Sequence, residues 1–183
     1  MAYQSINPYD GEKLKTFEQL NDTQLEAAID TAAKCFDAWR RTTFHERATI
    51  IARAATILRE RIEEFARPVT LEMGKLIEQA RGEVRLSADI IEYYARNAEC
   101  FLAAEHLKPG SGEAQVESSP LGVLFGVEPW NFPYYQLARF AAPNLMAGNV
   151  VMVKHAGCVP QCAIAFEKLF GTRVRRLART PTC

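Results

Sequence analysis

Two continuous apolar runs constrain the fold more than any other feature of the sequence. They occupy residues 121–127 and 149–153, and roughly twenty residues separate them. Neither run alternates apolar and polar residues, and such runs are typical of strands buried on both faces of a parallel sheet. Residues 134–147 between them predict a helix that ends at Gly148, because glycine suits the left-handed position after a helix. A strand, a helix and a strand at this spacing predict one βαβ unit.

The first hundred residues are predicted to be mostly helical. Thr23 with Glu26, and Thr43 with Glu46, stand three positions apart as in a capping box, where hydroxyl and carboxylate each bond a free backbone N–H. Behind each pair, apolar residues recur every three or four positions, which is the pattern of an amphipathic helix. Two helices are therefore expected in this part of the chain.

Glycine and proline mark the remaining boundaries. A break at Pro68 and Gly74 separates the second helix from a longer third one, expected from residue 75 to about residue 104. The N-terminal lead-in is expected to be extended, with a turn at residues 7–11, and residues 115–118 predict a short exposed strand. The expected fold class is α/β, with a helical N-terminal region packed on a truncated, Rossmann-like parallel sheet.

Charge and cysteine content exclude several partners. The 22 Lys+Arg balance the 22 Asp+Glu, so no long-range field attracts nucleic acid or anionic lipid, and neither is an expected partner. The longest apolar run is too short to span a bilayer, and residues 1–20 lack the apolar core of a signal peptide.

The five cysteines are an odd number without framework spacing, and Cys35 and Cys100 are expected to be buried. A cytoplasmic protein is predicted.

The last residues, 171–183, differ from what precedes them. They hold four arginines and no acidic residue, and the helical apolar period is lost. One interpretation is a basic, solvated tail. The favoured one is a foreign end, from a shifted reading frame, because a lone βαβ unit is an incomplete sheet with apolar edges. Residues 1–170 are therefore expected to be part of one domain.

A polar residue flanked by rigid and aromatic neighbours follows the first apolar run directly. Residues 128–133 read Glu-Pro-Trp-Asn-Phe-Pro, and ligands of open α/β sheets bind just beyond the carboxyl ends of the strands. The amide of Asn131 is a candidate donor to an oxyanion that develops on a carbonyl oxygen, a role whose loss typically costs about 2.7–4 kcal/mol. The alternative is that Asn131 only bonds the backbone of a turn.

The string Pro-Trp-Asn-Phe-Pro at 129–133 is followed by Ala-Gly-Asn at 147–149 and by Val-Lys at 153–154. In this order the three motifs resemble the aldehyde dehydrogenase superfamily, and the succinate-semialdehyde dehydrogenases within it most. The resemblance runs from about Ile6, through the Glu-Met-Gly-Lys string at 72–75, to about Phe170. It implies that residues 1–170 are the N-terminal part of an NAD(P)-binding domain.

The resemblance also implies a reaction. A cysteine thiolate attacks an aldehyde, the amide of Asn131 stabilises the resulting oxyanion, hydride passes to NAD(P)+, and a glutamate activates the water that releases the acid. Such enzymes place the cysteine, the glutamate and the pyrophosphate-binding turn downstream of this region, and none of these motifs is found here. The chain alone is therefore predicted to be inactive.

The cofactor site implied by the resemblance includes six residues: Glu128, Pro129, Trp130, Asn131, Lys154 and Gly157. In the family, the lysine that matches Lys154 reaches the adenosine ribose, whereas the alternative is a strand-end lysine in water. Where present, a glutamate three residues after that lysine binds the ribose 2′-hydroxyl and repels a 2′-phosphate. This chain has Gly157 there, so the preference between NAD and NADP stays open.

Arg139 stands eight residues after Asn131, on the predicted helix. An arginine on a helix is ordinarily a solvated residue. Succinate-semialdehyde dehydrogenases nevertheless resemble this chain in having arginine at that step, and a guanidinium matches a carboxylate in bidentate geometry. The predicted substrate is an aldehyde with a carboxylate tail, most simply succinic semialdehyde.

Two other functions stay open. His155, Cys158 and Cys162 offer three metal-ligand side chains close in sequence, although structural zinc usually takes four, and no metal site is predicted. The other alternative is a non-enzymatic remnant that pairs with intact subunits through its exposed strand. The resemblance supports this alternative, because members of the aldehyde dehydrogenase superfamily are homo-oligomers.

Overall fold

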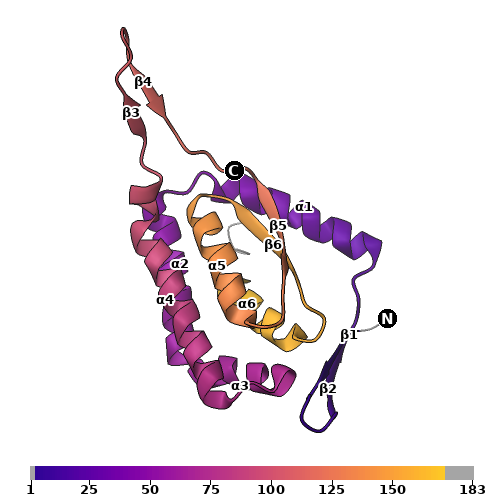
Figure 1. Cartoon of the computed structure of the whole chain (residues 1–183). Coiled ribbons are helices and arrows are strands. Elements are labelled where there is room, and N and C mark those ends of the chain that lie inside the picture. The colour runs from indigo at the N-terminus through magenta and orange to yellow at the C-terminus, as the bar shows by residue number, and fades with distance from the viewer. Residues whose placement is uncertain (1–2, 172–183) are drawn as a thin grey trace.

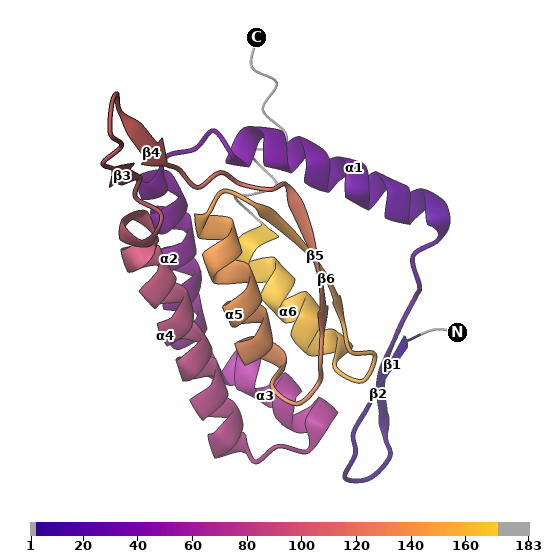
Figure 2. The same ribbon diagram turned by 45° about the horizontal axis from the view of Figure 1, so that its top comes forward.

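The computed structural model describes residues 3–171, and its elements form layers around a parallel pair of strands (Figures 1 and 2). In chain order the elements are β1 (Tyr3–Ile6), β2 (Lys13–Phe17), α1 (Asp22–Trp39), α2 (Phe44–Glu60), α3 (Ile62–Met73), α4 (Ile77–Phe101), β3 (Glu105–Leu107), β4 (Ala114–Val116), β5 (Val123–Glu128), α5 (Pro133–Met146), β6 (Val150–His155) and α6 (Pro160–Gly171). Helix α1 runs along one face of β5 and β6, and α5 packs on the other (Figures 1 and 2). Helices α2 and α4 lie side by side beyond α5.

The predicted βαβ unit is confirmed. Strands β5 and β6 pair in parallel, from Val123 opposite Val150 to Glu128 opposite His155, and α5 connects them. Helix α5 lies so close to the sheet that a Cβ added at Gly126 would come within 2.7 Å of the Phe140 ring. Glycine at 126 therefore allows the close approach of strand and helix, and a larger residue there would displace the Phe140 ring.

The core lies mainly between the helices. Its largest fully buried side chains include Trp39, Tyr134, Ile51, Leu58 and Ile91. The Nε1–H of Trp39 donates to the carbonyl of Leu145 at 2.9 Å, which joins the end of α1 to the end of α5.

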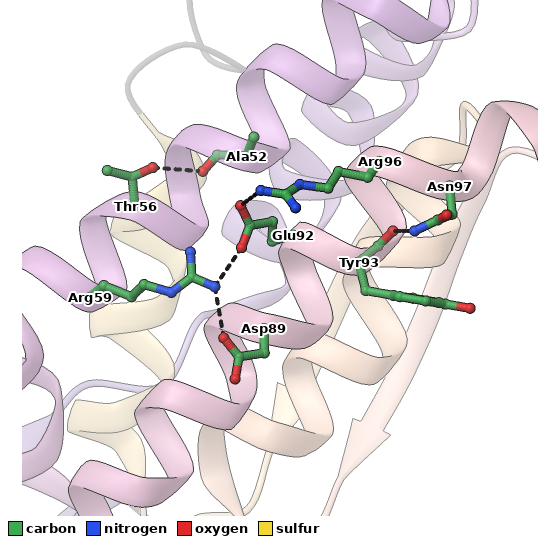
Figure 3. A network of polar contacts seen from close by, with 8 residues as sticks. All are labelled: Ala52, Thr56, Arg59, Asp89, Glu92, Tyr93, Arg96 and Asn97. Atoms are coloured by element: carbon green, nitrogen blue, oxygen red, sulfur yellow. Dashed lines mark hydrogen bonds and ion pairs between the residues drawn. The ribbon is translucent and has the colours of Figure 1, made fainter.

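Ion pairs on the outer surface also join α2 to α4. In Figure 3, the guanidinium of Arg59 on α2 reaches Asp89 at 2.7 Å and Glu92 at 2.6 Å, and Arg96 contacts Glu92 from the other side. Since each of these pairs is in contact with solvent, its contribution to stability is small, typically about 0.2–1 kcal/mol.

The two capping-box predictions have different outcomes. The box at Thr43 and Glu46 is confirmed, since each side chain bonds the other's backbone N–H. The first helix, however, begins two residues earlier than the Thr23 box predicts. Asn21 is its N-cap and forms the capping box with Gln24, with bonds of 2.8 and 3.0 Å. Asparagine caps at least as well as threonine, so the earlier start prevails.

The break predicted at Pro68 is wrong, whereas the one at Gly74 is confirmed. The chain leaves the helical path at Arg61, which has φ −117° and ψ 33°, and Pro68 lies inside α3. The buried Phe65, Ala66 and Val69 around the proline show that packing outweighs its local cost. Gly74 ends α3 with φ 70°, the left-handed conformation typical of a residue after a helix.

Two burial predictions are also wrong. Strand β5 is not buried on both faces, because Phe125 is 66% and Val127 is 70% exposed. Within residues 3–171 only β6 pairs with β5, and α1 leaves these two side chains uncovered. Cys100 is exposed near the end of α4, whereas Cys35 is buried as expected.

Two antiparallel hairpins project from the helical layers (Figure 1). The turn predicted at residues 7–11 joins β1 to β2 and includes Gly11 at φ 75°. The exposed strand predicted at residues 115–118 is β4, which pairs with the unpredicted β3. No helix in the described part of the chain is long and apolar enough to cross a membrane. The tail predicted at residues 171–183 lies outside the described residues, apart from Gly171 at the end of α6.

Candidate active site

The parallel register brings the two predicted site segments to one edge of the sheet. Glu128 lies opposite His155 at the carboxyl ends of β5 and β6, and Val127 lies opposite Lys154. The segment that follows Glu128 therefore leaves the sheet beside the segment that follows Lys154. This edge is where ligands of parallel α/β sheets bind.

The side chains at this edge are open to solvent. Trp130 is 57% exposed, and Pro129, Asn131 and Lys154 are also exposed. Among residues 3–171, the side-chain amide of Asn131 has no hydrogen-bond partner, and only its backbone carbonyl is bonded. The alternative in which this amide bonds the backbone of its own turn therefore has no support in the structure.

A buried ion pair lies beneath the loop that carries Asn131. The ammonium of Lys75 contacts the Oε2 of Glu83, and the two side chains are only 11% and 1% exposed. Lys75 also donates to the carbonyl of Asn131 at 3.2 Å and lies 3.9 Å from the centroid of the Phe132 ring. One lysine from the α3–α4 connection thus contacts two consecutive residues of the loop.

The other oxygen of Glu83 caps α5. Its Oε1 accepts from the backbone N–H of Tyr134 at 2.9 Å and of Tyr135 at 3.4 Å. The N-cap residue of this helix, Phe132, offers no side-chain cap, so the carboxylate on α4 takes that role. A carboxylate at a helix N-terminus is stabilised by the free N–H groups that point at it.

A second buried carboxylate caps α6 in the same way. Glu72 on α3 accepts from the N–H of Gln161 at 2.9 Å and of Cys162 at 3.0 Å. The side chain of Gln161 in turn donates to Ser5 on β1 at 2.8 Å. Both helices that follow the two parallel strands are therefore held at their N-termini by carboxylates from the helical layer.

His155 is occupied by backbone contacts. Its Nδ1 accepts from the N–H of Ala156 at 2.8 Å, so its Nε2 carries the proton and donates to the carbonyl of Pro133 at 3.0 Å. Burial lowers the pKa of His155, although the Pro133 carbonyl and the carboxylates of Glu72 and Glu83 oppose the shift. The ring is therefore neutral, and its hydrogen bonds link the end of β6 to the start of α5.

The structure does not gather the residues of the metal alternative into a site. Both nitrogens of His155 are used, Cys158 is exposed and Cys162 is buried. Within the range 3–171, no group of three His, Cys, Asp or Glu side chains is placed to hold a metal ion. The cysteines in that range, including Cys35 and Cys100, are all free thiols.

The lowered pKa of His155 predicts acid sensitivity. As the pH falls through the ordinary value of 6.5, the unfolded chain binds a proton that the folded chain binds only at lower pH, so stability is full above this value and declines below it. When the pH is lowered from 7.5 to 5.5, the unfolding free energy of the unchanged chain should fall further than that of His155→Gln. The difference between the two decreases should be on the order of 1 kcal/mol. Urea unfolding at both pH values measures this difference. The exposed His106→Gln is the control, and equal behaviour of the two variants would contradict the prediction.

Arg139 and Glu128 line a shallow hollow beside the sheet edge. The hollow has a volume of about 220 Å³, and Gln136 and Phe140 complete its lining. The guanidinium of Arg139 lies 5.2 Å from the centroid of the Tyr135 ring. Partial burial raises the pKa of Glu128, and the charge of Arg139 acts against this rise. Arg139 is thus an exposed cation on the same side of the sheet as Glu128, and Asn131 does not line this hollow.

Gly157 is in close contact with the N-terminal hairpin. A Cβ added at this position would lie 3.2 Å from the ring of Tyr3 on β1. The ring of Tyr3 therefore occupies the space that a larger residue at 157 would need.

Comparison with known proteins identifies the family. The profile described as the aldehyde dehydrogenase family matches residues 1–173. The chain belongs to the aldehyde dehydrogenase family. Two similar proteins are a succinate-semialdehyde dehydrogenase [NADP(+)] from Deinococcus radiodurans, 46% identical over 168 residues, and a probable one from Synechocystis, 43% identical over 172 residues.

Solved structures of the family share this fold. Succinic semialdehyde dehydrogenase from Streptococcus pyogenes, in complex with NADP+, is 40% identical with a TM-score of 0.89, and the match covers 98% of this chain and 39% of that one. A betaine aldehyde dehydrogenase variant from Staphylococcus aureus, in complex with NAD+, is 26% identical with a TM-score of 0.87, covering 94% and 35%.

This aldehyde dehydrogenase chain spans about a third of the length of its relatives. The match covers 92% of the chain but 35% of the Deinococcus protein, and 94% of the chain but 38% of the Synechocystis protein.

The Ala-Gly-Asn motif that contributed to the resemblance lies at the opposite end of the strands. Gly148 follows α5 with φ 90°, and the buried Oδ1 of Asn149 accepts from the N–H of Leu121 at 2.6 Å and of Gly122 at 3.0 Å. These bonds hold the N-terminal ends of β5 and β6 together. In this aldehyde dehydrogenase chain the motif is therefore structural rather than part of the exposed edge.

The sequence pattern did not identify the roles of Lys75 and Glu83. A signal was present, because Glu83 lies on the helix face that also carries the buried Ala80, Val84 and Ser87. A carboxylate on such a face requires a partner, since an unpaired buried charge is costly. The pattern does not name that partner.

Proposed function

We propose that residues 1–170 form the N-terminal part of an NAD(P)+-dependent aldehyde dehydrogenase domain that oxidises succinic semialdehyde to succinate, with residues 171–183 as a separate basic tail. The observation that carries this proposal is the exposed, unbonded amide of Asn131 at the carboxyl end of β5, beside the end of β6. The printed names of the Deinococcus and Synechocystis relatives support the substrate.

In the proposed reaction, Asn131 donates its side-chain N–H to the oxygen of the aldehyde as negative charge develops there. A fixed donor stabilises the transition state because it needs no reorientation during the reaction. Asn131 follows the carboxyl end of β5, and its exposed side chain is free to face a substrate at the sheet edge.

The residues at the sheet edge fit a dinucleotide. NADP+ or NAD+, when bound, supplies the acceptor for hydride. Lys154 offers an exposed ammonium for the ribose end, and the exposed Pro129 and Trp130 adjoin it together with the partly buried Glu128. No carboxylate stands at Gly157 to repel a 2′-phosphate, and the relatives named as NADP(+) enzymes support NADP+ as the preferred cofactor.

Arg139 is proposed to bind the distal carboxylate of the substrate. Arg139→Ala should lower kcat/KM for succinic semialdehyde by about tenfold to hundredfold, because a charge-assisted hydrogen bond is worth about 1.5–3 kcal/mol. An uncharged aldehyde of similar size should lose much less. Both substrates are compared in a fusion of residues 1–170 to the downstream two-thirds of the Deinococcus enzyme. Equal losses for the two aldehydes would show that Arg139 does not recognise the carboxylate.

The isolated chain is proposed to be inactive, because the nucleophile and the general base of the family are supplied by later residues. Purified chain incubated with NAD+ or NADP+ and succinic semialdehyde should give no reduced cofactor above background when the absorbance of the reduced cofactor is followed. The fusion should give turnover with NADP+. Turnover by the chain alone would contradict its proposed inactivity. No turnover by the fusion would contradict the proposed dehydrogenase activity.

A second candidate function is pairing with intact subunits of the family. The hairpin of β3 and β4 projects from the helices, and its Leu107 and Val116 are 46% and 54% exposed. Open strand edges favour such pairing. Co-purification of the chain with tagged Deinococcus enzyme tests it, and separate elution would exclude it. The small-molecule aldehyde is otherwise the only partner proposed, and the expected location is the cytoplasm.

A further inference from the structure

The ion pair of Lys75 and Glu83 is buried, and both oxygens of its carboxylate accept from a donor. Oε2 of Glu83 contacts the ammonium of Lys75, and Oε1 accepts from the N–H groups of Tyr134 and Tyr135. A buried pair gains little net stability, since desolvation offsets much of the attraction. Stability alone is therefore a weak reason for this arrangement.

The contacts of the pair converge on one short loop. Lys75 holds the carbonyl of Asn131 and lies against the ring of Phe132, while Glu83 holds the backbone just beyond the loop at Tyr134. His155 adds a third contact at the carbonyl of Pro133. The backbone is thus held at the carbonyl of Asn131 and over the three residues that follow it, while the side chain of Asn131 is exposed.

We propose that Lys75 and Glu83 are positioning residues that fix the backbone of Asn131, so that its amide is already placed for the developing oxyanion. This inference rests on the proposed function. Neither side chain is in the exposed edge, so both act through Asn131 rather than on the substrate. Because the value of a preorganised donor depends on its placement, a displacement of about 1 Å can cost up to about a hundredfold in rate.

A double-mutant cycle in the fusion separates positioning from general structural damage. Lys75→Met should lower kcat by about tenfold to hundredfold while the KM for NADP+ changes by less than about threefold. In an Asn131→Ala background, the same substitution should cost less than about threefold, because residues that act through one group are not additive. A full and equal loss in both backgrounds, or no loss in either, would overturn the proposal.

Two further variants control the interpretation. Arg59→Met removes a cation from the exposed ion pairs between α2 and α4, and it should leave kcat unchanged. Glu83→Gln keeps an oxygen that can accept from Tyr134 but removes the charge that holds Lys75, so its kcat should fall between those of Glu83→Ala and the unchanged fusion.

Amide hydrogen exchange in the whole 183-residue chain tests the positioning without turnover. Glu83→Ala should speed exchange at Tyr134 and Tyr135 by about tenfold or more, with less change at buried amides of α2. Unchanged exchange at the two tyrosines would refute the inference even if the fusion is active. An inactive unsubstituted fusion would instead refute the proposed function, while the exchange result still decides whether the pair fixes the loop.

Discussion

In the fusion enzyme, Asn131→Ala is expected to lower kcat for succinic semialdehyde by about 10²–10³-fold, the usual cost of removing one oxyanion donor. The expectation follows from the side-chain amide, which is exposed at the carboxyl end of β5 and makes no hydrogen bond within residues 3–171. Because the donor acts mainly in the transition state, the KM values should change far less than kcat. Steady-state kinetics with NADP+ measure both quantities.

Asn97→Ala is a matched control for the loss of an amide. The side chain of Asn97 donates to the carbonyl of Tyr93 within α4, on the surface shown in Figure 3 and away from the sheet edge. This variant should retain the kcat of the fusion. If Asn131→Ala also retains it, the amide has no part in catalysis and the proposed mechanism fails.

Trp39→Ala is expected to lower the free energy of unfolding of the chain by about 3–5 kcal/mol, as for other large core aromatics. The indole is 1% exposed, and its N–H joins the end of α1 to the end of α5. The substitution leaves a cavity between these helices and removes the indole donor from the carbonyl of Leu145, which keeps its bond from the N–H of Gly148. Urea unfolding followed by circular dichroism measures the loss.

Trp39→Phe divides this effect into two parts. Phenylalanine keeps most of the buried ring but cannot donate to Leu145, so its cost should be about 1–2 kcal/mol, mostly for the lost hydrogen bond. A Trp39→Ala variant that loses less than about 1 kcal/mol would mean that α1 contributes little to the core.

Several features were predictable because neighbouring residues decide them. The Thr43 capping box depends on side chains three positions apart, and the βαβ unit depends on two apolar runs with a helical segment between them. The family motif at residues 129–133 can be recognised from its own five residues and from the strand before it. These signals specified the α/β class and the edge of the sheet where Asn131 lies.

Other features were decided by contacts between distant parts of the chain. The continuous apolar run of β5 does not show which face is covered, and the exposure of Phe125 follows from where α1 lies. Pro68 stays within α3 because its neighbours are buried against other helices, a gain that no local propensity contains.

Local sequence signals specified the type of most elements, the family motif and the position of Asn131 after a strand, since short-range hydrogen bonding and apolar periodicity depend on neighbouring residues. Folding across long sequence separations paired Glu83 with Tyr134, 51 residues away, and Lys75 with Asn131, 56 residues away. A buried carboxylate signals that a partner exists, but chain folding over long separations chooses which helix N-terminus and which ammonium provide it.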